Sequence, residues 1–127
     1  MKRLIIVIAA SVFALTSCAQ NEITQKNVFR LFPTENYWTF IKLNTRNGQM
    51  WQVQFSVSEP KENFEVILNS LSLVSYEGES NGRFTLYPTK NMFTFLLLDQ
   101  VNGDVYQTQW SREEEYRGII RKIKSKE

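Results

Sequence analysis

Alternating apolar and polar positions predict a β-protein whose strands occur in two similar sets. Residues 38–56 and residues 93–111 each contain an alternating segment, a tight loop ending in Asn-Gly, and a second alternating segment. This pattern is typical of a β-hairpin, in which the glycine supplies a positive φ. Short strands are expected just before each hairpin, at residues 29–32 and 84–87, each followed by a Pro-Thr-x-Asn turn.

The two sets are copies of one repeat. Residues 29–56 align with residues 84–111 at a constant offset of 55, without a gap across 28 positions. Chance matching would give roughly two identities, so thirteen indicate an internal duplication. The identical pairs are Phe29/Phe84, Leu31/Leu86, Pro33/Pro88, Thr34/Thr89, Asn36/Asn91, Thr39/Thr94, Phe40/Phe95, Leu43/Leu98, Asn47/Asn102, Gly48/Gly103, Gln52/Gln107, Gln54/Gln109 and Ser56/Ser111.

The turn sets the register of each hairpin. If Asp99 opposes Asp104, alternation divides the side chains between two faces. An aromatic face is expected to carry Phe93, Phe95, Leu97, Tyr106, Thr108 and Trp110 in the second copy, and Trp38, Phe40, Lys42, Trp51, Val53 and Phe55 in the first. The opposite, mixed face carries Thr39, Ile41, Gln52 and Gln54 in the first copy, and Thr94, Leu96, Gln107 and Gln109 in the second.

Each repeat is expected to hold about four strands. Residues 63–68 and 116–121 predict a further strand after each hairpin, whereas residues 68–74 fit either a strand or a short helical turn. An isolated hairpin with one apolar face is marginal, so the two copies are expected to cover each other. We predict a mainly β domain of two tandem hairpin repeats of about 55 residues each, forming one small antiparallel sheet, a sandwich or a partly open barrel.

This single domain is expected at residues 28–127, with repeat 1 at 28–82 and repeat 2 at 83–127. The chain before it begins with a basic pair and an apolar run, which predicts a signal peptide at residues 1–17. The four residues ending at Cys18, Leu-Thr-Ser-Cys, resemble the lipobox of bacterial lipoproteins, which implies cleavage before Cys18 and acylation of its thiol. An ordinary signal peptide or an uncleaved anchor is the alternative.

Lipidation would place the protein in the cell envelope. Cys18 is the only cysteine and has no partner for an internal disulfide, which favours acylation. Residues 18–27 then form the lipidated cysteine and a polar tether. Ala19, rather than an aspartate, follows the cysteine, and the resemblance to lipoproteins therefore favours the outer membrane. The acyl chains make the membrane the first expected partner.

The charge balance argues against nucleic-acid binding. The whole chain carries +2, but removal of residues 1–17 leaves 13 basic and 13 acidic residues. A neutral domain has no electrostatic basis for binding phosphates, so no nucleic acid is expected. Basic residues do gather near the end, at Arg117, Arg121, Lys122, Lys124 and Lys126. They fit a solvated tail or a contact with anionic headgroups or a partner.

The composition also argues against an enzyme. The chain has no histidine and no cysteine besides Cys18, and it contains no phosphate-binding, dinucleotide-binding or nucleophile-elbow motif. No cofactor, metal or catalytic residue is therefore predicted. Asp99 and Asp104 flank a turn and fit turn formation or weak calcium binding. A carboxylate-based glycoside hydrolase is the less favoured alternative, with candidates at Glu35, Glu59, Glu62 and Glu65.

The repeat resembles one found in small bacterial proteins without an assigned activity. In that family it reads F-x-L-x-P-T-x-N-M-W-x-F-x-x-L-D-x-x-x-G-x-x-W-Q-x-Q-W, and the resemblance covers most of both copies. It implies a fold unit and no chemistry. Substitutions between the copies, such as Tyr106 for Trp51, keep size and fit structural roles. A weaker likeness is to the blades of quinoprotein β-propellers, although two repeats cannot close a propeller.

These patterns favour a non-catalytic binding module with a protein, peptide or glycan ligand. The matched glutamines and the seventeen aromatic residues of the chain are suited to such a role. The glutamines could equally cover the solvent face of a sheet. The alternative function is a structural subunit or an inhibitor of an envelope hydrolase, docked through strand edges. The candidate binding residues are Gln52, Gln54, Gln107 and Gln109, and the predicted lipidation site is Cys18.

Overall fold

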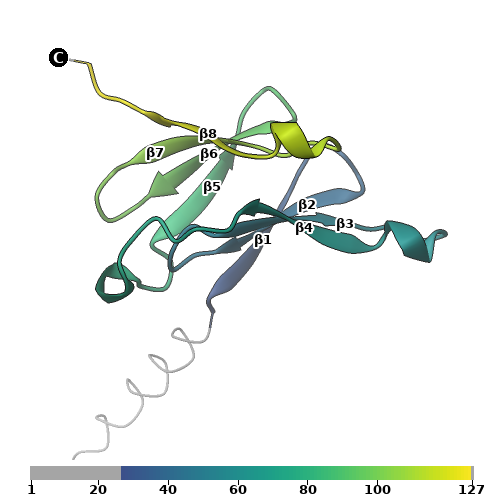
Figure 1. The fold of residues 1–127 in the computed structure, drawn as a ribbon, viewed down its shortest axis with the longest axis horizontal. Helices are drawn as coiled ribbons and strands as arrows, with labels where there is room; N and C mark the ends of the chain where they lie inside the picture. The colour runs from purple at the N-terminus through teal and green to yellow at the C-terminus, as the bar shows by residue number, and fades with distance from the viewer. Residues whose placement is uncertain (1–26, 127) are drawn as a thin grey trace, which may run out of the picture.

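A computed structural model of the chain describes residues 27–126, which form two four-stranded antiparallel sheets packed as a small sandwich (Figure 1). Each sheet is a meander whose strands follow chain order. Sheet 1 contains β1 (Phe29–Pro33), β2 (Thr39–Asn44), β3 (Met50–Gln54) and β4 (Phe64–Asn69). Sheet 2 contains β5 (Phe84–Pro88), β6 (Thr94–Asp99), β7 (Val105–Gln109) and β8 (Gly118–Ile123). Short 3-10 helices lie at η1 (Pro60–Glu62), η2 (Tyr76–Gly78) and η3 (Glu114–Tyr116). The predicted four strands per repeat are confirmed.

The Pro-Thr-x-Asn turn has the same hydrogen bonds in both copies. The hydroxyl of Thr34 donates to the carbonyl oxygen of Thr39 at 2.8 Å, and Thr89 donates to Thr94 at the same distance. The Oδ1 atoms of Asn36 and Asn91 accept the backbone N–H groups two residues further on, each at 2.9 Å. These side chains hold the turn by local bonds to the backbone, which explains their identity in the two copies.

The register predicted from the turns is confirmed. The backbone N–H of Asp99 donates to the carbonyl oxygen of Asp104 at 2.8 Å, and Leu97 opposes Tyr106. In the first copy Lys42 opposes Trp51 in the same way. The loop glycines Gly48 and Gly103 have φ values of 86° and 85°, as the hairpin turn requires.

The two copies bury opposite faces of the same repeat. In sheet 1 the mixed face is buried, with Ile41 at 1% exposure, and its aromatic face points outward. In sheet 2 the aromatic face is buried, with Phe95 at 3% exposure, and its mixed face points outward. The sheets therefore pack by two different surfaces of one repeat, and not by two copies of the same surface.

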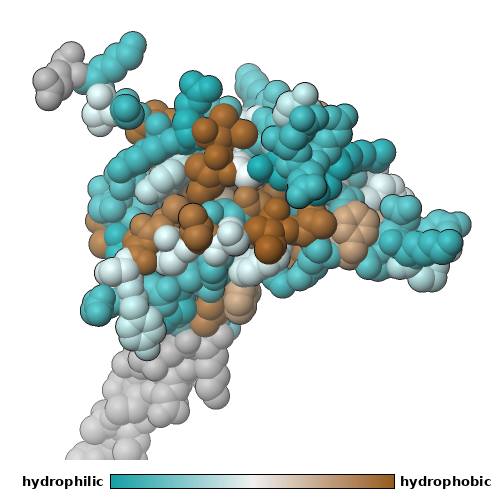
Figure 2. Space-filling model, in the orientation of Figure 1, coloured by the Kyte–Doolittle hydropathy of each residue, from teal (hydrophilic) through white to brown (hydrophobic). Residues whose placement is uncertain are grey.

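One hydrophobic core lies between the sheets. Its buried members are Ile41, Leu43, Met50 and Leu68 of sheet 1 and Phe84, Leu86, Phe95, Leu97 and Trp110 of sheet 2 or its end. Figure 2 shows apolar side chains across the middle of the molecule, where the sheets approach, with polar side chains above and at one end. Of residues 68–74, predicted as strand or helical turn, Leu68 and Asn69 end β4, whereas residues 70–74 form an irregular segment that leads to η2.

Gly118 allows the two sheets to approach closely where β8 begins. Its φ is 121°, and a Cβ atom at this position would lie 2.8 Å from the carbonyl oxygen of Leu68 in β4. Glycine alone fits both the conformation and the contact. The backbone of sheet 2 thereby reaches the last strand of sheet 1 beside the candidate site described below.

Candidate functional site

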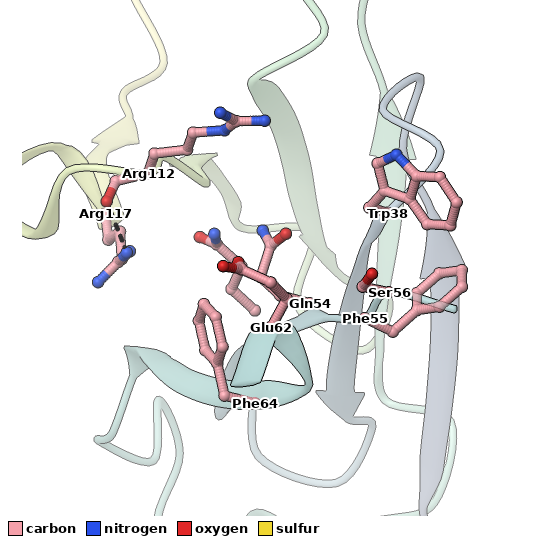
Figure 3. Close-up of a pocket in the computed structure, with 9 residues that line it drawn as sticks. Trp38, Gln54, Phe55, Ser56, Glu62, Phe64, Arg112 and Arg117 are labelled. Atoms are coloured by element: carbon pink, nitrogen blue, oxygen red, sulfur yellow. Dashed lines mark hydrogen bonds between the residues drawn. The ribbon is translucent and has the colours of Figure 1, made fainter. Parts of the chain in front are cut away.

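A cavity of about 340 Å³ opens at the end of the sandwich that carries η1 and η3. This volume is at the lower end of the range for small-molecule sites, so it suits a compact ligand. Its lining consists of Trp38, Gln52, Gln54, Phe55, Ser56, Glu62, Phe64, Arg112 and Arg117. Sheet 1 and η1 form one wall, and the segment between β7 and β8 forms the other (Figure 3).

Gln52 brings an unused hydrogen-bond donor to the cavity. Its side chain is 1% exposed, and its Oε1 atom accepts the backbone N–H of Ser111 at 3.1 Å. Because that partner is a donor, the amide orientation is fixed and the NH₂ group cannot exchange places with the oxygen. The Nε2 atom is buried and has no hydrogen-bond partner within residues 27–126. Buried unpaired donors are rare and costly, so this one calls for a partner such as an ordered water or an acceptor atom of a ligand.

Gln54 provides a second donor, but a less constrained one. Its Nε2 atom is also buried without a partner in the described part of the chain, while its Oε1 atom lies 3.1 Å from the hydroxyl of Thr39. The single proton of that hydroxyl has an alternative acceptor, Asn36 Oδ1, at 3.2 Å. If Thr39 donates to Asn36, the Gln54 amide can turn and donate to Thr39. Gln52 is therefore the more diagnostic of the two glutamines.

The wall from sheet 2 supplies positive charge. Arg117 is held in place because its Nε donates to the carbonyl oxygen of Ser111 at 2.7 Å and its Nη2 to that of Arg112 at 2.9 Å. Figure 3 shows Arg112 across the cavity from Gln54 and Glu62. Two guanidinium groups against the single carboxylate of Glu62 leave the lining with a net positive charge. Guanidinium groups bind carboxylates strongly and with defined geometry.

Three aromatic side chains line the cavity: Trp38, Phe55 and Phe64. Figure 3 shows the ring of Phe64 directed towards Gln54 and Glu62, and this side chain is 41% exposed. Trp38 and Phe55 point away from Gln54 in the same view. Their rings meet edge to face, with centroids 5.3 Å apart, on the outer face of sheet 1. A ligand next to Gln54 would therefore meet the ring of Phe64 rather than those of Trp38 and Phe55.

The structure does not bring the four candidate glutamines together. Gln52 and Gln54 belong to the inner face of sheet 1, whereas Gln107 and Gln109 belong to the outer face of sheet 2. The interpretation of the glutamines as one matched set on two similar exposed surfaces is wrong, because the sheets pack by opposite faces. Only Gln52 and Gln54 line the cavity.

The two aspartates are engaged in ion pairs. Asp99 is buried and accepts two hydrogen bonds of 2.9 Å from the guanidinium of Arg83. Burial acts to raise the pKa of the Asp99 carboxyl, but Arg83 and the backbone N–H groups of Val101 and Asn102 together hold that pKa below its usual range. Asp104 pairs with Lys122 at 3.0 Å. Residues 27–126 contain no group of three acidic or cysteine side chains that could hold a metal ion.

The carboxylates named for a hydrolase are dispersed. Glu65 pairs with Lys42 at 2.8 Å on the outer face of sheet 1, and the cavity lining contains only Glu62. Glycoside hydrolysis normally requires two facing carboxyl groups about 5 to 10 Å apart. The lining of this cavity does not provide that pair.

The predicted signal peptide and Cys18 lie outside the described residues. Within residues 27–126, no helix has the length and apolar composition needed to cross a membrane. Comparisons with protein-family models, with curated proteins and with solved structures find no match. The geometry of the cavity and the patterns of the sequence therefore carry the functional argument.

Sequence reasoning missed Arg112, Arg117 and Phe64 as members of a site. Arg117 had been grouped with the basic tail, and the other two had no motif. They converge on Gln52 only because β3, β4 and the segment between β7 and β8 meet at one end of the sandwich. These three residues could be assigned to one site only if it were known which face of each sheet is buried, and no pattern in the sequence shows that.

Proposed function

We propose that the protein is a lipid-anchored, non-catalytic binding module of the cell envelope, and that its site is the cavity between the sheets. The ligand class that fits best is a small sugar acid. Its carboxylate would meet Arg112 and Arg117, its hydroxyl groups would meet Gln52 and Gln54, and one face of its ring would lie on Phe64. The lipobox-like sequence supports the location, with Cys18 as the anchor and the outer membrane as the membrane.

The buried, unpaired Nε2 of Gln52 carries this proposal. Leaving a polar group without a hydrogen bond in a protein interior costs about 1 to 3 kcal/mol. The oxygen of a ligand hydroxyl group would accept from Nε2 and remove that cost. The net positive charge of the lining supports an anionic ligand over a neutral one.

Titration calorimetry with glucuronate and glucose tests the proposal. The two sugars differ at C6, where glucuronate carries a carboxylate in place of a hydroxymethyl group, so glucuronate is expected to bind more tightly. Residues 19–127 are suitable material, because every member of the core lies between Phe32 and Ile119. Gln52→Met should weaken glucuronate binding roughly 2- to 10-fold, as expected for loss of a hydrogen bond to a neutral hydroxyl group.

The duplication supplies a matched control. Gln107→Met makes the same substitution at the equivalent position of the second copy, outside the cavity, and should leave the affinity unchanged. Arg112→Met should reduce binding of glucuronate more than binding of glucose. Equal affinity for both sugars, or failure to bind glucuronate, would reject a sugar-acid site.

A further inference from the structure

The outer face of sheet 1 is a broad apolar surface without a cover among the described residues. Its apolar members are Phe29, Leu31, Trp38, Phe40, Trp51, Val53, Phe55 and Ile67. Phe29 is 54% exposed and Leu31 is 60% exposed. The one cation on this face, Lys42, is already paired with Glu65 at 2.8 Å and lies 5.1 Å from the ring of Trp51. An apolar sheet face of this extent marks an interaction surface.

The outer face of sheet 2 is also without a cover among residues 27–126. It carries Tyr87, Thr94, Leu96, Leu98, Val105, Gln107, Gln109, Arg121 and Ile123. Tyr87 is 51% exposed, whereas its counterpart in the first copy, Phe32, packs against the core. The face is mixed in character, with aliphatic side chains between polar ones.

These two outer faces are copies of the two faces that already pack together inside the chain. Phe29 and Leu31 correspond to Phe84 and Leu86, which are 1% and 4% exposed because they lie against sheet 1. The mixed face of sheet 2 likewise repeats the face of sheet 1 that receives them. The two surfaces that pack together between the sheets are thus present a second time, on the two outer faces of the sandwich.

We infer that the protein associates with further copies of itself head to tail, with the outer face of sheet 1 of one copy packed on the outer face of sheet 2 of the next. The contact would repeat between chains the contact that joins the two sheets within a chain. Such a heterologous contact closes into a ring or continues as a fibre. Four-stranded meanders arranged radially close with about four to eight units, so two, three or four chains would complete a ring.

This arrangement accounts for the second pair of glutamines. Inside the chain, Gln52 accepts the backbone N–H of Ser111. Between chains, Gln107 of one copy would face Ser56 of the next, the residue that corresponds to Ser111. The backbone N–H of Ser56 donates to Asn63 Oδ1 at 3.2 Å within the chain, and it would exchange that partner for Gln107 on association. The identity of Gln52 with Gln107 and of Ser56 with Ser111 is expected if both pairs serve the same packing contact.

Light scattering on residues 19–127, with variants that block one face each, tests the inference. Leu31→Glu places a charge on the outer face of sheet 1, and Tyr87→Glu places one on the outer face of sheet 2. Both side chains are more than half exposed, so the variants should fold. We expect a parent mass of several chains, and a single-chain mass for each variant alone. An equimolar mixture of the variants should give a mass of two chains, because each retains the face that the other lacks.

Two controls carry the same charge elsewhere. Leu71→Glu and Tyr76→Glu alter side chains that are 72% and 83% exposed in the segment between the sheets, and should keep the parental mass. A parent with the mass of one chain would overturn the inference, as would a mixture that stays at one chain. A dimer of either variant alone would overturn it too, since it would indicate like faces packing together. A single-chain parent that binds lipid vesicles through Leu31 would assign the face to a membrane instead.

Discussion

The side-chain oxygen of Gln52 accepts the backbone N–H of Ser111 at 3.1 Å, across 59 positions of the chain. This bond joins the inner face of sheet 1 to the end of sheet 2, and it leaves the amide NH₂ group of Gln52, a residue that lines the cavity, buried without a partner in the described chain. Gln107, the identical residue in the second copy, is on an outer face. Identical residues of the two repeats are therefore buried in one copy and on an outer face in the other.

Matched leucines should differ sharply in their contribution to stability. Leu86→Ala removes a side chain from the core and should lower the free energy of unfolding by about 2 to 5 kcal/mol. Leu31→Ala alters an exposed side chain and should change the free energy of unfolding by about 0.5 kcal/mol or less. Urea unfolding of residues 19–127 at low protein concentration measures both. Equal losses would show that the copies do not bury opposite faces.

The strands and their register could be predicted, because each is fixed locally. Alternation defines the strands, and the turn glycines Gly48 and Gly103 set which residues face each other. The choice of buried face could not be predicted in the same way. Either face of each hairpin is apolar enough to be covered, so burial depends on the partner sheet and not on the hairpin itself.

Acid should weaken the protein through Asp99. Since the folded-state pKa of this carboxyl is held below its usual value, the unfolded state binds a proton more readily. The stabilisation is therefore present above the unfolded-state pKa of about 3.9, and is lost as the pH falls through the lower folded-state pKa. Asp99→Asn should lower the Tm at pH 7, and the difference from the parent should shrink between about pH 4 and pH 2.

Asp104→Asn is the control for this measurement. Asp104 pairs with Lys122, whose side chain is half exposed, and such surface pairs contribute little to stability. Its Tm at pH 7 should stay close to that of the parent. A difference between the Asp99 variant and the parent that stays constant down to pH 2 would contradict the account of the buried pair.

The role of Asp99 illustrates what sequence reasoning lacks. It was expected to form a turn or to bind calcium weakly, and it does accept turn N–H groups from Val101 and Asn102. Its buried pairing with Arg83 depends on the residue just before β5, whose counterpart in the first copy is Val28. The duplication hides this difference, because Asn44 stands where the second copy has Asp99. Long-range pairing of this kind has no periodic signal.

Lipidation of Cys18 is tested by metabolic labelling with an alkyne fatty acid in cells that produce the whole chain. Label should enter the parent and be lost completely from Cys18→Ser, which should also leave the membrane fraction. Ser11→Ala, a change within the apolar run of the predicted signal peptide, should keep both the label and the location in the membrane fraction. Label that persists in Cys18→Ser would place acylation elsewhere and contradict the predicted anchor.

The cavity could not be predicted, even though two of its residues were candidates. Gln52 and Gln54 were singled out for their match with Gln107 and Gln109, which concerns packing and not binding. What marks Gln52 is its burial without a partner for Nε2 in residues 27–126, and that property depends on the segment after β7 closing over it. The convergence of donors is a property of the sandwich and not of the repeat.

The central claim, that Gln52 donates to a ligand in the cavity, is tested most directly by the NMR signals of the side-chain amides. In residues 19–127 labelled with nitrogen-15, the Gln52 NH₂ pair is assigned by its absence from Gln52→Met. Glucuronate is expected to shift the Gln52 NH₂ signals and to leave the Gln107 NH₂ signals unchanged. Its effect on the Gln52 signals should be larger than that of glucose. Gln52 NH₂ signals that do not shift while glucuronate binds, or that shift no more than the Gln107 signals, would contradict a hydrogen bond from Gln52 to the ligand.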